Sequence, residues 1–238
     1  MSYIKNVDSS WKGLYKLGGI AALTAIPVFL LDIIISLGGG DVSPHTLTAV
    51  DWFALFQNKW LFGLRLLGII NIVSLTLMIP MYFAIYTVHR QVYKACAALA
   101  MIIYLTGMAI YISNNAAIPM FVLSSKYMAA ATDAQRALLA AAGEAIVAKG
   151  ADFTPGSFIG FFFTEIAGIA FSIIMLRGRI FIKAAAYAGI LGFSFLTIFT
   201  VWVTFIPAMF DVAMIIAMVG GLSSMVWYIL IGRRFLQL

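Results

Sequence analysis

Charged and chemically reactive side chains are scarce in this sequence. Only 10% of its 238 residues are charged, two are histidines, and Cys96 is the single cysteine. A lone cysteine cannot form an internal disulfide, and neither His45 nor His89 has partners at the spacing of a zinc site. The HExxH, GxSxG and Walker motifs are absent as well. We therefore predict no metal site, no cofactor and no catalytic residue.

Apolar residues, by contrast, make up 63% of the chain, whereas a soluble domain has about 45–50%. This excess excludes soluble, disordered and fibrous proteins. A helix needs about 20 apolar residues to cross a hydrocarbon core of about 30 Å. We predict an all-α, single-domain membrane protein with six spans, over residues 17–37, 61–88, 95–116, 157–176, 184–206 and 209–231. The first span is too long for the core of a signal peptide, so we interpret it as a retained signal anchor.

The basic residues are distributed unevenly between the two sides of these spans. One side carries ten basic residues and a single acidic one, Asp8. The ten are Lys5, Lys12, Lys16, Arg90, Lys94, Arg177, Arg179, Lys183, Arg233 and Arg234. The positive-inside rule then predicts a multi-pass protein of the inner (plasma) membrane with both termini in the cytoplasm. Because the net charge of +6 is accounted for in this way, we predict no nucleic-acid partner.

Two longer segments lie on the opposite side. Residues 46–57 resemble a short interfacial helix. Residues 132–150 predict a second helix, with Thr132 as N-cap, Gln135 completing a capping box and Gly150 as C-cap. Its apolar residues share one face, which we expect to lie on the outer membrane surface or over the bundle; they are Leu138, Leu139, Ala142 and Ile146.

Polar side chains inside spans are costly and usually face the interior of a bundle. Six of them form our predicted ligand-binding set, and all are on the outer half or at the midplane of the membrane: Asp32, Arg65, Asn71, Asn114, Asn115 and Glu165. This one-sided distribution predicts a polar cavity that opens outward. The alternative for Asp32 and Arg65 is an ion pair that fixes helix register. The alternative for the two adjacent asparagines is capping of a helix end broken by Pro119.

The segment from Ser125 to Ala145 carries a Tyr-x-x-Ala-x-x-x-Ala-Gln-Arg pattern, beginning at Tyr127. Together with Asn114 and the closing Trp227–Arg234 segment, it resembles the signature loop of a bacterial family of uncharacterised six-span membrane proteins. The resemblance implies a fold and a topology over most of the chain. It implies no reaction and no residue roles.

Three functions follow as hypotheses. The first is binding or transport of a small polar or amphiphilic ligand, or a lipid, in the outward-facing cavity. The second is a membrane-embedded enzyme that modifies lipid, with Glu165 or Asp32 as acid and base; the lack of an activated nucleophile weighs against it. The third is an accessory subunit whose polar groups only specify packing. Small residues at four-residue spacing, such as Ala188 and Gly192, allow close helix packing within the bundle or in an oligomer.

Overall fold

A computed structural model describes residues 8–37 and 47–238, and within these ranges the chain is helical, with no strand. Lys5, Asp41, His45 and the first residue of the predicted 46–57 helix lie outside them. Six helical segments of the described chain are long and apolar enough to cross a membrane. The predicted all-α architecture with six candidate spans is therefore confirmed.

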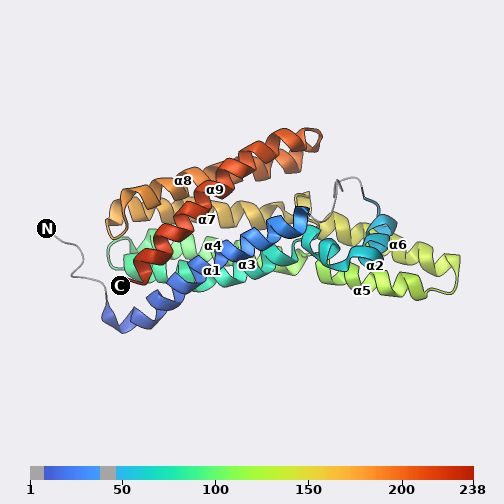
Figure 1. Cartoon of the computed structure of the whole chain (residues 1–238), viewed down its shortest axis with the longest axis horizontal. Helices are drawn as coiled ribbons and strands as arrows, with labels where there is room; N and C mark the ends of the chain where they lie inside the picture. The colour runs from blue at the N-terminus through green and yellow to red at the C-terminus, as the bar shows by residue number, and fades with distance from the viewer. Residues whose placement is uncertain (1–7, 38–46) are drawn as a thin grey trace.

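Six helices run side by side and form the bundle seen in Figure 1. They are α1 (Lys12–Leu37), α3 (Ile69–His89), α4 (Lys94–Asn114), α7 (Pro155–Gly178), α8 (Lys183–Phe205) and α9 (Phe210–Phe235). The start of α1 and the end of α9 lie at the same end of this bundle (Figure 1). The α3–α4 and α7–α8 connections, which carry Arg90 and Arg179, join helices at that end as well.

The predicted second span, 61–88, is not one continuous helix. Helix α2 (Ala49–Leu66) takes the first residues of that stretch, and the chain breaks at Gly68 before α3 begins. Gly68 has a φ of 82°, in the left-handed region that favours glycine. A Cβ at this position would collide with the Tyr111 hydroxyl and the Asp152 carboxylate. The helix breaks where the backbone of Gly68 closely approaches Tyr111 and Asp152, and a hydropathy pattern cannot show such a contact.

Small residues allow the helices of the bundle to pack closely. A Cβ on Gly107 of α4 would lie 2.9 Å from the Gly160 carbonyl oxygen of α7. A Cβ on Gly192 of α8 would lie 2.8 Å from the backbone nitrogen of Ser224 on α9. Gly192 therefore allows close packing between two helices within the bundle. The core itself is rich in aromatic rings, with Trp227 fully buried and Tyr82 almost so.

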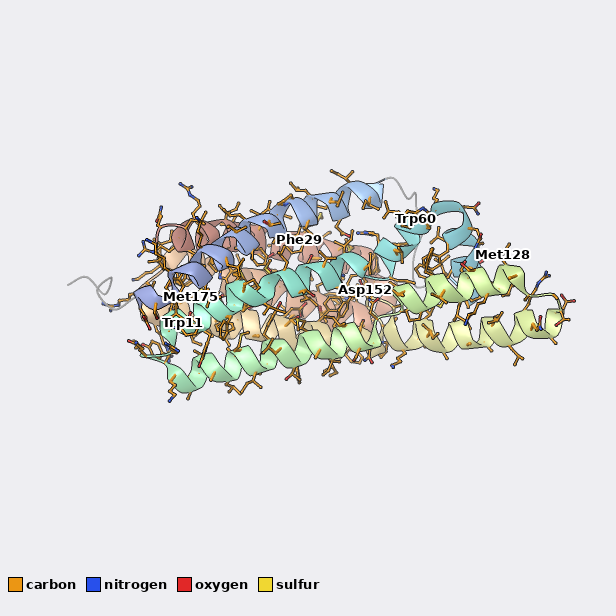
Figure 2. All side chains as sticks on the ribbon, turned by 90° about the horizontal axis from the view of Figure 1, so that it is seen from below. Trp11, Phe29, Trp60, Met128, Asp152 and Met175 are labelled. Carbon is orange, nitrogen blue, oxygen red and sulfur yellow. The ribbon has the colours of Figure 1, made fainter. Side chains whose placement is uncertain are left out.

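Beyond the bundle, three helices form an extension along the long axis. Helix α5 (Ala117–Ala129) continues α4, and α6 (Asp133–Gly150) leads into α7, while α2 packs against both. Figure 2 shows Trp60 and Met128 on this extension, with Asp152 where the extension meets the bundle. The backbone N–H of Ala116 donates to the Gly150 carbonyl at 3.1 Å and ties the two helix pairs together.

The caps of the extension agree in part with the sequence. Thr132 is the N-cap of α6 as predicted, since its hydroxyl accepts from the Gln135 N–H at 3.2 Å. The Gln135 side chain, however, accepts from Ala131 rather than from Thr132. Gly150 is the last helical residue rather than the cap. Glycine is required at position 150 for a steric reason, because a Cβ there would collide with the Asn114 carbonyl.

Of the two predicted positions of this helix, the one over the bundle is wrong, because α6 continues the line of α7 (Figures 1 and 2). Its buried side agrees only in part with the predicted face. Ile146 packs on the core of the extension, but Leu138 is 72% exposed, and Gly143, which is outside the predicted face, is buried against Ala49 and Phe53 of α2. The predicted interfacial helix is longer than expected, and its Trp52, Phe53 and Phe56 are buried in the extension. The aromatic face of α2 therefore covers α5 and α6.

Candidate ligand cavity

A cavity of about 230 Å³ lies among the six helices of the bundle. Its walls come from α1, α3, α4, α7, α8 and α9, together with Phe153 of the α6–α7 connection. Most of the lining is apolar or aromatic. The lining side chains that can form hydrogen bonds through a carboxyl, amide or aliphatic hydroxyl group are Asn71, Ser74, Thr164, Glu165 and Thr200.

Helical periodicity directs Glu165 toward this space. Glu165, Gly168 and Ser172 are spaced by three and four residues, so they share the face of α7 that packs on α8. Gly168 leaves room for the ring of Phe193, and Thr200 follows Phe193 by two turns on α8. Asn71 and Ser74 lie one turn apart on α3 and form part of another wall.

The carboxyl group of Glu165 is buried and only half satisfied. Its residue is 8% exposed, and the Thr200 hydroxyl donates to Oε1 at 2.7 Å. Within the described part of the chain, Oε2 has no hydrogen-bond partner. Thr197 also lies beside this carboxyl, but its own hydroxyl donates to the Phe193 carbonyl at 2.7 Å. Glu165 is thus a lining residue of the cavity whose carboxyl group has one oxygen without a donor.

A second buried carboxylate lies near the end of the cavity, and sequence reasoning missed it. Asp152, in the α6–α7 connection, is 6% exposed. It accepts from the Tyr111 hydroxyl at 2.6 Å and from the Asn71 amide at 2.8 Å, so both of its oxygens are engaged. Asn71 also lines the cavity and links the two regions. Asp152 lies between the third and fourth predicted spans, and no local pattern shows that Tyr111 and Asn71, from two distant helices, converge on it.

Asp32 and Arg65 form an ion pair with each other, which was the alternative to a role in ligand binding. Nε of Arg65 donates to Oδ1 of Asp32 and Nη2 donates to Oδ2, each at 2.9 Å. The side chains are 31% and 21% exposed, respectively. Neither residue lines the cavity. The pair joins α1 to α2, the first helix of the extension, so its geometry supports an anchoring role.

The two asparagines also lie outside the cavity. The Asn114 amide donates to the Gly156 carbonyl at 3.1 Å. The Asn115 amide donates to the Leu67 carbonyl at 2.7 Å, while its oxygen accepts from Ala117 N–H at 2.9 Å. Asn115 therefore provides hydrogen-bond partners for a carbonyl at the end of α2 and an N–H at the start of α5. This is the alternative interpretation, in which the asparagines cap helix ends.

The predicted site is thus divided by the structure. Asn71 and Glu165 reach a common cavity, whereas Asp32, Arg65, Asn114 and Asn115 stabilise the junction with the extension. The prediction of a single polar funnel lined by all six residues is wrong, because four of them use their polar groups on each other or on backbone carbonyls. Among the described residues, no group of three or more histidine, cysteine, aspartate or glutamate side chains is arranged to hold a metal ion.

The chemistry of the cavity follows from this inventory. Apolar walls favour a ligand with an apolar body, and the few polar groups can orient it. The Glu165 carboxyl can bind either a hydrogen-bond donor or a positive charge. No model of a known protein family matches the chain, and neither a curated protein nor a solved structure matches it.

Proposed function

We propose that this chain is a multi-pass membrane protein that binds or transports a small amphiphilic ligand in the cavity beside Glu165. The observation that carries the proposal is the unpartnered Oε2 of a buried carboxyl group. A buried polar atom without a partner costs about 1–3 kcal/mol, and more when it is charged. A ligand that donates to this oxygen, or places charge beside it, would offset that cost.

The orientation of the bundle is part of the proposal. Basic residues of the described chain cluster at the end where α1 begins and α9 ends; they include Lys12, Arg90, Lys94, Arg177 and Arg234. By the positive-inside rule this end faces the cytoplasm, and the α2, α5 and α6 extension projects from the opposite surface. Asn71 and Phe153 lie on the extension side of the cavity, and we propose that a ligand from outside enters beside them.

Mass spectrometry of compounds that co-purify with the protein tests the proposal. The wild type is compared with two cavity variants, Glu165→Ala and Ser74→Phe, which remove the acceptor and fill the space, respectively. Asp133→Ala, which removes an exposed carboxylate of α6 outside the cavity, is the control. We expect a compound that is retained by the wild type and the control but lost from both cavity variants. The same set of compounds in all four proteins would contradict the proposal.

A further inference from the structure

The cavity has an unbalanced set of charges. Glu165 is one of its lining residues, and among the described residues that line it none is lysine, arginine or histidine. The nearby Arg65 has its guanidinium on both oxygens of Asp32. The other buried carboxylate of this region, Asp152, is held by the neutral donors of Tyr111 and Asn71. The surroundings of the cavity therefore favour a positive charge over a negative one.

Aromatic rings dominate the remaining wall. Eight of the sixteen lining residues are phenylalanine or tyrosine. They include Tyr82, Tyr104, Phe161, Phe193, Phe199 and Tyr228. The Tyr104 hydroxyl is occupied by the Leu75 carbonyl, to which it donates. This residue therefore offers the cavity its ring rather than its hydroxyl hydrogen. The negative face of an aromatic ring attracts cations, most strongly where water is excluded.

From these two features we infer that the ligand is a small lipophilic cation, such as an amine or quaternary ammonium ion with an apolar substituent. The inference rests on the proposed function and names its ligand class. The positive head would lie beside the carboxyl group of Glu165, and the rings would surround the head and the apolar body. An anionic ligand would instead bring a second negative charge next to Glu165. The volume of about 230 Å³ is below the about 300–1,000 Å³ of drug-sized sites, so the ligand is small.

Binding of benzyltrimethylammonium to the full-length protein in a non-ionic maltoside detergent tests the inference. The compound carries a permanent charge on a benzyl group. Its uncharged isostere, neopentylbenzene, has carbon in place of nitrogen and is used as a competitor. We expect the wild type to bind the cation and the neutral isostere to compete at least about tenfold more weakly. Because this comparison uses the wild type alone, it does not depend on the folding of any variant.

Variants then locate the binding. Glu165→Gln keeps the size of the side chain and an acceptor for Thr200, and we expect it to weaken binding of the cation by about tenfold or more. Ser74→Phe should abolish binding by filling the cavity. Glu144→Gln, the same change on α6, should leave binding unaltered. Monodisperse elution and an unchanged helical circular dichroism spectrum confirm that each variant is folded.

Three results would overturn the inference. They are equal binding of the two compounds, cation binding that persists in folded Glu165→Gln, and no binding of either compound. None of the three removes the proposed function by itself, because that function is judged by the co-purified compound. Loss of a neutral compound from both cavity variants would support the proposed function while rejecting a cationic ligand.

Discussion

Thr200 on α8 donates a hydrogen bond of 2.7 Å to Oε1 of Glu165 on α7 and so joins two helices at the wall of the cavity. Both residues are buried, at 3% and 8% exposure. The bond holds one oxygen of the carboxyl group, while the other oxygen, Oε2, has no hydrogen-bond partner among the described residues. Stability and ligand binding are therefore expected to depend on this contact in different ways.

Thr200→Val should destabilise the protein by about 1–3 kcal/mol, because it removes the 2.7 Å donor to Oε1 of the buried Glu165 carboxyl. Thr200→Ser keeps the hydroxyl and should lose less. Detergent-induced or thermal unfolding of the purified protein measures the difference. An equal loss in the valine and serine variants would show that packing of the methyl group, and not the hydrogen bond, is what matters.

Asp152 and Tyr111 should be strongly coupled. Tyr111→Phe removes the 2.6 Å donor to a carboxylate that is 6% exposed, and should cost about 1–3 kcal/mol of unfolding free energy. Asp152→Asn alone alters the same contact without leaving a buried charge. In a double-mutant cycle we expect a coupling energy of about 0.5–3 kcal/mol. Additive effects of the two substitutions would contradict a direct contact.

The sequence predicts what local pattern controls and misses what tertiary contacts decide. The spans follow from runs of apolar residues, and Thr132 follows from a cap with its partner three residues away. Asp152 is buried only because Tyr111 and Asn71, 41 and 81 residues distant, converge on it. The apolar run around Glu165 predicts that this residue lies in a span, but no sequence pattern shows that Arg65 is paired with Asp32.

Exchanging the two charges of the Arg65–Asp32 pair should destabilise the protein less than removing one of them. Arg65→Ala leaves the Asp32 carboxylate without its bidentate partner and should destabilise the protein by about 1–3 kcal/mol. Replacing both residues, with Asp32→Arg and Arg65→Asp together, should recover part of that loss because the opposite charges remain adjacent. Unfolding measurements on the three proteins give the comparison. A double variant less stable than Arg65→Ala would indicate that geometry rather than charge is essential.

Gly68→Ala should be among the most damaging glycine substitutions. The residue has a φ of 82°, where a side chain costs about 1–2 kcal/mol, and the added Cβ would collide with Tyr111 and Asp152. Gly221→Ala on α9 is the matched control, since nothing lies within 4 Å of its Cβ position. That change should be neutral or stabilise the helix by up to about 1 kcal/mol. Equal melting temperatures for the two variants would contradict the close approach at Gly68.

The extension should be accessible from outside the cell. Leu138 on α6 is 72% exposed, and Gln91 lies exposed in the α3–α4 connection at the opposite end. In a Cys96→Ser background, a membrane-impermeant maleimide should label Leu138→Cys in intact cells but label Gln91→Cys only after the membrane is permeabilised. Both variants become equally reactive in detergent if the protein is folded. Labelling of Gln91→Cys alone in intact cells would contradict the proposed orientation and place the extension in the cytoplasm, because Leu138 and Gln91 lie at opposite ends of the molecule.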